Sequence, residues 1–202
     1  MTLIALEPTP AEVARHAAAL AIAYNDPHNA PLLGHTERLD EADVIAHYAR
    51  LAAGGDHGFL VLRAGPDGAG EQVGERVGEG AGELLADGDL RGVRDGVAEL
   101  AFLVARVDHQ GRGLGTRVAL LLHAFAFLRL GLERVYASVR PDNPASRRVF
   151  DKLGHAEDTS PDGRAYAEEP DDLVLVAERA AFLESHAAAL AEIRITVRPS
   201  PA

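Results

Sequence analysis

The chain has no cysteine among its 202 residues. This absence excludes disulfide bonds, thiolate metal sites and a covalent intermediate on a cysteine. The sequence also lacks a basic N-terminal region followed by a sustained apolar run, and no segment reaches membrane-spanning length without charges. We therefore expect a cytoplasmic protein with no membrane partner.

Positive charge is scarce as well, with 20 basic against 31 acidic residues and a formal net charge of -11. This balance argues against a nucleic-acid partner, because neutralisation of phosphates dominates such binding. The charge either favours a cationic or amine partner or only keeps the protein in solution. Nine histidines are present, but none forms H-E-x-x-H or another close ligand pair, so the sequence predicts no metal site.

The length and the hydrophobic content of 47% predict one domain over residues 1–202. Residues 65–83 are rich in glycine and glutamate, and we interpret them as an extended hairpin loop between two strands, or else as a flap over a site. Residues 179–193 are interpreted as a C-terminal helical extension. Its apolar residues could pack against a second copy, which would make a homodimer.

The order of the elements predicts the fold class. Two helices are expected first, over residues 10–24 and 41–54. The remaining chain is expected to form strands over 58–63, 97–107, 133–139 and 173–178, with helices over 116–131 and 144–154. This order indicates an α/β fold with a mixed central sheet flanked by helices on both faces.

One glycine-rich loop, HQGRGLG at 109–115, lies between an apolar strand and a helix. A helix that begins at such a turn binds anions, because its unpaired N–H groups and its dipole point at the ligand. The dinucleotide fingerprint fails because its third glycine is missing. The phosphate loop G-x-x-x-x-G-K-[ST] also fails, because the chain contains no Gly-Lys pair.

The pattern that remains, Q-x-x-G-x-G at 110–115, resembles the acyl-CoA pyrophosphate loop of the GNAT superfamily of N-acetyltransferases. A second segment, PDNPASRRVFDKLGH at 141–155, resembles the other hallmark segment of this superfamily at the expected spacing. The resemblance covers residues 97–175. Within the superfamily, NPASRRV, Phe150 and KLG are similar to the branch of ribosomal-protein N-terminal acetyltransferases.

The resemblance implies acetyl-CoA as the co-substrate. The amides of residues 110–116 would hold the pyrophosphate, and the preceding strand would bind the pantetheine arm along its backbone. The residues expected to contact the cofactor are Leu103, Val104, Ala105, Gln110, Gly111, Arg112, Gly113, Leu114, Gly115, Thr116, Asn143, Ser146 and Phe150.

The implied reaction is aminolysis of a thioester, in which an amine of pKa about 10 must lose a proton. Glu99 is the candidate base, because its apolar neighbours would raise its pKa by desolvation; the alternative is an exposed residue at a strand end. The segment between Glu99 and the glycine loop is one residue longer than in many relatives, so we expect a bulge in the strand.

The reaction also needs a general acid that protonates the departing thiolate. Many relatives carry a tyrosine where this chain has Phe150, which has no proton to donate. Ser138 is the candidate in its place; Ser146, water, or unassisted departure of the thiolate are the alternatives. The acceptor pocket is expected among the residues that end the first helix and follow it: Tyr24, Asn25, Asp26, His28 and His35.

These observations predict an N-acetyltransferase that moves the acetyl group of acetyl-CoA directly to a primary amine, on a small molecule or a protein N-terminus. Two alternatives stay open: a transferase for a longer acyl group, and a non-catalytic acyl-CoA-binding or interaction module.

Overall fold

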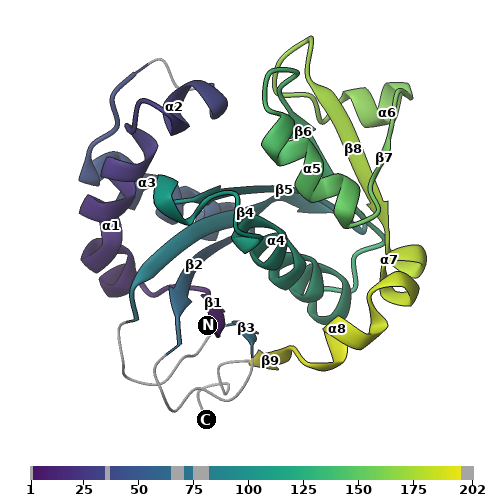
Figure 1. The fold of residues 1–202 in the computed structure, drawn as a ribbon, viewed down its shortest axis with the longest axis horizontal. Coiled ribbons are helices and arrows are strands. Elements are labelled where there is room, and N and C mark those ends of the chain that lie inside the picture. The colour runs from purple at the N-terminus through teal and green to yellow at the C-terminus, as the bar shows by residue number, and fades with distance from the viewer. Residues whose placement is uncertain (1, 35–36, 65–70, 75–81, 197–202) are drawn as a thin grey trace.

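The computed structural model describes residues 2–34, 37–64, 71–74 and 82–196. Its centre is a mixed sheet in the order β7-β8-β6-β5-β4-β2-β1-β3-β9 (Figure 1). The strands are β1 Leu3–Leu6, β2 His57–Arg63, β3 Gln72–Gly74, β4 Leu84–Arg94, β5 Val97–Val104, β6 Arg134–Val139, β7 Ala156–Glu157, β8 Leu173–Glu178 and β9 Arg194–Thr196. The helices are α1 Pro10–Tyr24, α2 Asn29–Leu32, α3 Glu41–Gly54, α4 Leu114–Ala124, α5 Pro144–Lys152, α6 Pro161–Arg164, α7 Arg179–Ser185 and α8 Ala187–Ala191, with a 3-10 turn at Val107–His109 and a π-helical turn at Phe125–Arg129.

Helices cover both faces of the sheet, as expected. Along β2, Phe59 and Val61 belong to the core cluster that includes α4, whereas Leu60 and Leu62 belong to the cluster with α1 and α3. This alternation follows from the two-residue period of a strand. The prediction of a mixed sheet between two helical layers is therefore confirmed.

Local signals fix the first two long helices. Thr9 and Glu12 form a capping box at the start of α1, and Asp40 and Asp43 form another at the start of α3. Gly55 then ends α3 in the left-handed conformation, which glycine adopts without strain. Both helices have the bounds that the sequence predicts.

The expectation that helices come first is wrong, because β1 precedes α1 and pairs with both β2 and β3. Its four residues, LIAL, are buried and too few to show a period, so only their sheet partners identify them as a strand. Between β4 and β5 the chain turns at Asp95-Gly96, where both residues have positive φ. Asp-Gly is the typical sequence of such a tight hairpin turn.

Two further segments that the sequence singles out contain short elements. Within the expected loop at 65–83, residues Gln72–Gly74 form β3, and residues 65–70 and 75–81 lie outside the described part of the chain. The segment at 179–193 contains α7 and α8, which meet at His186. Within the described residues, no helix combines the length and the apolar character needed to cross a membrane.

The sheet opens beside β5. Strand β5 pairs in parallel with β6 only from Val97 to Glu99, while its ladder with β4 continues in unshifted register from Glu99 to Val104. The expected bulge after Glu99 is therefore wrong; the irregularity of that ladder lies between Arg91 and Arg94. Beyond Glu99, the edge of β5 that faces β6 has no strand partner among the described residues.

Candidate active site

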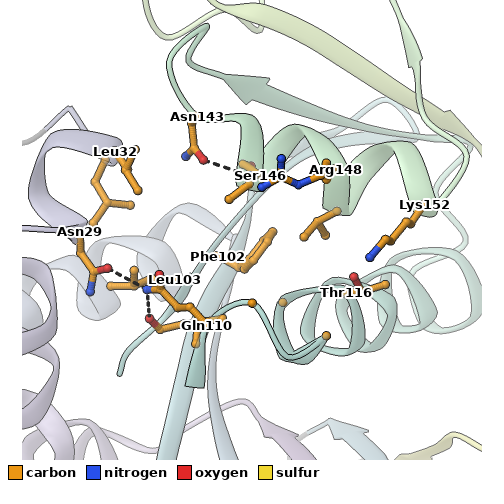
Figure 2. Close-up of a pocket in the computed structure, with 17 residues that line it drawn as sticks. Asn29, Leu32, Phe102, Leu103, Gln110, Thr116, Asn143, Ser146, Arg148 and Lys152 are labelled. Carbon is orange, nitrogen blue, oxygen red and sulfur yellow. Dashed lines mark hydrogen bonds between the residues drawn. The ribbon is translucent and has the colours of Figure 1, made fainter. Parts of the chain in front are cut away.

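A cleft of about 310 Å³ lies where β5 and β6 diverge (Figure 2). Its walls come from the second half of β5, the glycine loop, α5 and the region of α2. The lining residues are Asn29, Leu32, Leu33, Phe102, Leu103, Val104, Gln110, Gly111, Gly113, Gly115, Thr116, Asn143, Ala145, Ser146, Arg148, Val149 and Lys152.

Nine of the residues predicted to bind the cofactor lie together in this lining, namely Leu103, Val104, Gln110, Gly111, Gly113, Gly115, Thr116, Asn143 and Ser146. Four others do not line it among the described residues: Ala105, Arg112, Leu114 and Phe150. Leu114 and Phe150 are core side chains, and the Phe150 ring packs edge-on against Phe102 with centroids 5.9 Å apart. Cofactor contacts of these four residues stay predictions.

The glycine loop ends in a helix N-terminus without a side-chain cap. Gly113 is the N-cap of α4 at φ 83°, and it provides no side-chain hydrogen bond. The first N–H groups of a helix have no partner inside the helix, so an anion can bind them. A Cβ on Gly115 would lie 3.2 Å from the Phe102 ring and would narrow the cleft. Backbone amides, open space and the cations of Arg148 and Lys152 together fit a pyrophosphate.

Sequence reasoning missed the wall formed by Asn29, Leu32 and Leu33. Asn29 is 1% exposed, and its Oδ1 accepts a hydrogen bond of 2.9 Å from Gln110 Nε2. Gln110 Nε2 also donates to the carbonyl of Val104 at 3.2 Å. No local pattern reveals a contact between residues so far apart in the chain.

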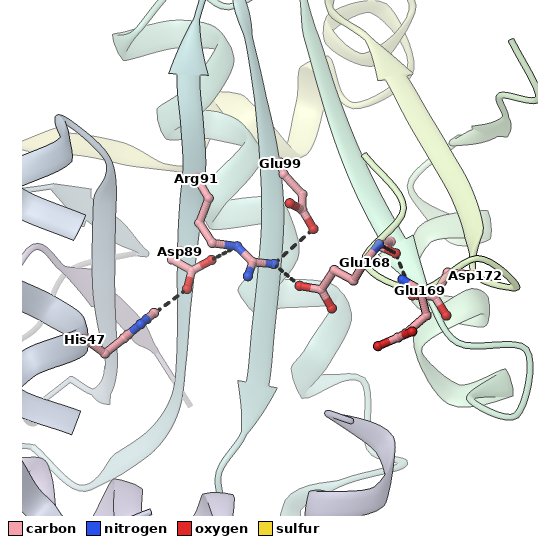
Figure 3. Close-up of polar contacts among 8 residues, drawn as sticks. His47, Asp89, Arg91, Glu99, Glu168, Glu169 and Asp172 are labelled. Atoms are coloured by element: carbon pink, nitrogen blue, oxygen red, sulfur yellow. Dashed lines mark hydrogen bonds and ion pairs between the residues drawn. The ribbon is translucent and has the colours of Figure 1, made fainter. Parts of the chain in front are cut away.

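Glu99 lies on the sheet face that carries α1 and α3, at the last position where β5 pairs with β6. Arg91, opposite it on β4, donates to Glu99 at 3.0 Å and to Glu168 at 2.7 Å, and lies 3.2 Å from Asp89 (Figure 3). Burial raises the pKa of Glu99 to about 7, although the guanidinium opposes this shift. A carboxylate with that pKa can accept a proton near neutral pH.

The hydroxyl of Ser138 is engaged in two hydrogen bonds. It donates to Asp172 Oδ2 at 2.8 Å and accepts from the backbone N–H of Glu168 at 3.0 Å. These contacts attach the segment that carries Glu168 to β6. A role as the acid stays a prediction, because the proton would have to leave its bond to Asp172.

A second buried carboxylate, Asp87 on β4, was not singled out from the sequence. Its Oδ2 accepts a hydrogen bond from the Tyr24 hydroxyl, while its Oδ1 is buried without a hydrogen-bond partner among the described residues. Burial raises the pKa of Asp87 to about 7. Asp87 is paired in register with Leu103, so this carboxylate lies beside the strand that lines the cleft.

The other residues proposed for an acceptor pocket do not line this cleft in the described chain, and their role stays a prediction. Asn25 links α1 to the backbone of Leu39, and Asp26 accepts a hydrogen bond from the N–H of exposed His28. His35 lies outside the described residues. Among the residues that the structure describes, no group of three or more candidate metal ligands occurs.

Comparisons with known proteins agree with this geometry. Residues 6–156 match the family model described as "Acetyltransferase (GNAT) domain". The N-acetyltransferase 9-like protein of Nematostella vectensis is 34% identical over 58 residues, a segment that spans 29% of this chain and 29% of that relative.

Solved structures share the fold at low sequence identity. The aminoglycoside acetyltransferase AAC(6')-Ib in complex with coenzyme A has a TM-score of 0.67 at 19% identity, covering 92% of this chain and 99% of that one. RimJ of Mycobacterium smegmatis in complex with CoA-disulfide has a TM-score of 0.61 at 20% identity, covering 86% of each chain.

Proposed function

The chain belongs to the GNAT acetyltransferase family, and we propose that it transfers the acetyl group directly from acetyl-CoA to a primary amine, with Glu99 as the general base. As in its family, acetyl-CoA supplies the acetyl thioester and an amine accepts the acetyl group. The observation that carries the proposal is the position of Glu99 at the point where β5 and β6 diverge, three residues before Phe102, the first residue of β5 that lines the cleft.

Two elements would bind different parts of the cofactor. Of the loop expected to hold the pyrophosphate at 110–116, the amide of Gln110 already donates to the carbonyl of Val107 at 3.0 Å, so the amides of residues 111–116 would bind it. The free edge of β5 at Leu103 and Val104 would bind the amide groups of the pantetheine arm. Asn143 and Ser146 line the opposite wall. The hydrogen bonds of Gln110 to Asn29 and to Val104 hold the start of the glycine loop in place.

In the reaction, the ammonium group of the acceptor gives a proton to the carboxylate of Glu99. The amine nitrogen then bonds to the acetyl carbon, the carbon–sulfur bond breaks, the nitrogen gives up its second proton to solvent, and the departing thiolate takes up a proton. Ser138 is our candidate donor of that proton. Ser138→Ala should then lower kcat more for acetyl-CoA at high pH than at low pH, where solvent supplies protons; an equal loss at every pH would assign Ser138 a positioning role only.

The absence of cysteine supports direct transfer in a ternary complex. Initial rates measured at varied acetyl-CoA and amine concentrations should give intersecting lines in a double-reciprocal plot, with no acetylated protein detectable by mass spectrometry. Parallel lines together with a stable acetyl-protein would refute direct transfer.

The same assay separates the alternatives. A transferase for a longer acyl group would use propionyl- or butyryl-CoA at least as well as acetyl-CoA, whereas a non-catalytic module would bind acetyl-CoA without releasing CoA. We further propose a cytoplasmic location and a homodimer through residues 179–193. Light scattering of the wild type and of Leu183→Glu tests the dimer.

A further inference from the structure

A second cavity, of about 210 Å³, lies on the sheet face that carries Glu99. It is bounded by the β4–β5 hairpin and by the segment before β8. Its lining residues are Arg91, Gly92, Arg94, Glu99, Ala165, Tyr166, Ala167 and Glu168. Glu99 lines this cavity and does not line the cofactor cleft among the described residues, so the cavity gives an amine access to Glu99 from the side away from the cofactor.

The charge of this cavity differs from that of the whole chain. Arg91 and Arg94 supply two cations, and Glu99 and Glu168 supply two carboxylates. The formal net charge of the chain, in contrast, is -11. The negative net charge of the chain therefore does not predict that this cavity binds polycations.

The two arginines differ in their partners. Arg91 is held by the carboxylates of Asp89, Glu99 and Glu168. Arg94 is exposed and forms no ion pair or side-chain hydrogen bond with any described residue. Arg94 pairs with Val97, two residues before Glu99 on β5, so Arg94 and Glu99 belong to the same sheet face.

The wall opposite the hairpin is firmly held. The Tyr166 ring stacks on that of Tyr136, with centroids 4.1 Å apart and an interplanar angle of 4°. The hydroxyl of Ser138 accepts a hydrogen bond of 3.0 Å from the N–H of Glu168, and Arg164 donates one of 2.5 Å to the carbonyl of Asp172. A cavity below the roughly 300–1,000 Å³ of drug-sized ligand pockets, with such a wall, suits a small acceptor.

We propose that this cavity is the acceptor pocket, and that it selects a small amine that also carries a carboxylate, as a free amino acid does. Arg94 binds the carboxylate, and the amine lies at Glu99, to which it gives its proton before the nitrogen bonds to the acetyl carbon. A guanidinium without a partner offers two parallel hydrogen bonds to a carboxylate. The inference rests on the proposed function, because Glu99 is the base in both.

The experiment compares acceptors that differ only in the carboxylate. CoA release is measured for the standard L-amino acids, each beside its primary amide, and for spermidine and a short peptide amide. Rates are compared per unprotonated amine, because conversion to the amide lowers the pKa of the amine. The preferred amino acid should exceed its amide in kcat/KM by about tenfold to a hundredfold, the range expected for a charge-assisted hydrogen bond.

Variants of Arg94 then identify the group responsible. Arg94→Ala should lower kcat/KM for the amino acid by about the same factor, mainly through KM, and leave the amide unchanged. Arg94→Lys keeps the charge and should retain part of the preference. Arg50→Ala removes the charge of another exposed arginine, on α3, and should change neither substrate.

Equal use of acids and amides, or a higher kcat/KM for spermidine or the peptide amide, would overturn the acceptor class while acetyl transfer stands. If the Arg94→Ala enzyme still prefers the amino acid to its amide, Arg94 does not bind the carboxylate, and its proposed role is overturned. Acetyl-CoA binding without turnover of any amine would contradict the proposed function itself, and with it this inference.

Discussion

The side chain of Asn29 joins the helix pair α1–α2 to the cofactor loop through its 2.9 Å hydrogen bond from Gln110. Its other end donates to the carbonyl of Ala23 in the last turn of α1, also at 2.9 Å. The next residue, Tyr24, donates to buried Asp87. A continuous set of contacts therefore connects the cofactor loop with the sheet face on which we place the acceptor.

Asn29→Ala should weaken acetyl-CoA binding by about 5- to 30-fold, because it removes one of the two hydrogen bonds that Gln110 Nε2 donates, at a cost of ~1–2 kcal/mol. Calorimetry on Asn29→Ala, Gln110→Ala and the double variant gives the coupling of the two residues. We expect the double variant to bind about as weakly as either single one.

Asn25→Ala is the matched control, because Asn25 also bonds the last turn of α1, through the carbonyl of Ala21, but does not line the cleft. Its acetyl-CoA affinity should equal that of the wild type. If the losses of acetyl-CoA binding free energy add up in the double variant, Asn29 and Gln110 act independently. That result would contradict the proposed coupling between the two residues.

Glu99→Gln should lower kcat by about 10²- to 10⁴-fold, the usual contribution of a general base. The acetyl-CoA dissociation constant should not change, because Glu99 lies outside the cofactor cleft. The base acts as a carboxylate, so wild-type kcat/KM should rise with pH through about 7, where Glu99 loses its proton. This rise should be absent from the variant.

Glu157→Gln removes the charge of an exposed glutamate on β7 and serves as the control for altered net charge. It should match the wild type at every pH. A Glu99→Gln enzyme with wild-type kcat would remove Glu99 from the chemistry and direct attention to Asp87, the other carboxylate whose pKa burial raises to about 7.

The core contains a histidine pair that should make the fold sensitive to acid. His123 is fully buried, with its Nε2 3.3 Å from that of His155, and burial lowers their pKa values to about 4 and about 2 respectively. Unfolded histidine titrates near pH 6.5, so the unfolded chain binds more protons below that pH. The contribution of the two neutral histidines to the free energy of unfolding is therefore fully present above about pH 6.5. It is lost as the pH falls from there toward the pKa values of the folded state.

At pH 5 the loss amounts to ~2 kcal/mol for each histidine. Urea unfolding of the wild type and His155→Gln should show it, because the difference between their free energies of unfolding should shrink by that amount from pH 7 to pH 5. His28→Gln alters an exposed histidine and should show no such change. A constant difference for His155→Gln would contradict this account of the buried pair.

The cofactor side of the site was accessible from the sequence, because its signals are local. Gln110 to Thr116 form one loop and helix start, and Asn143 caps its own helix by accepting from the N–H of Ser146 at 3.0 Å. The caps of α1 and α3 are local in the same way. Each pattern lies within a few residues, so neighbours in sequence are neighbours in space.

The remaining features depend on contacts between distant segments. Asp87 lies in the stretch ADGDLRG, whose composition is typical of a loop, and only its pairing with Leu103 makes it a buried strand residue. Arg94 at the end of β4 and Tyr166 before β8 line one cavity, although β5 and β6 lie between those two strands in the sheet. Without the fold, no spacing rule brings these side chains together.

The central claim is that the uncapped N-terminus of α4 holds the pyrophosphate of acetyl-CoA. Calorimetric titration with acetyl-CoA should give binding for the wild type and for Gly55→Glu, and none for Gly113→Glu. Both glycines have positive φ, 79° and 83°, with no atom within 4 Å of an added Cβ, so the two substitutions strain the backbone alike and add the same charge. Only Gly113 lines the cleft. Undiminished binding by Gly113→Glu, or equal loss in both variants, would contradict the account.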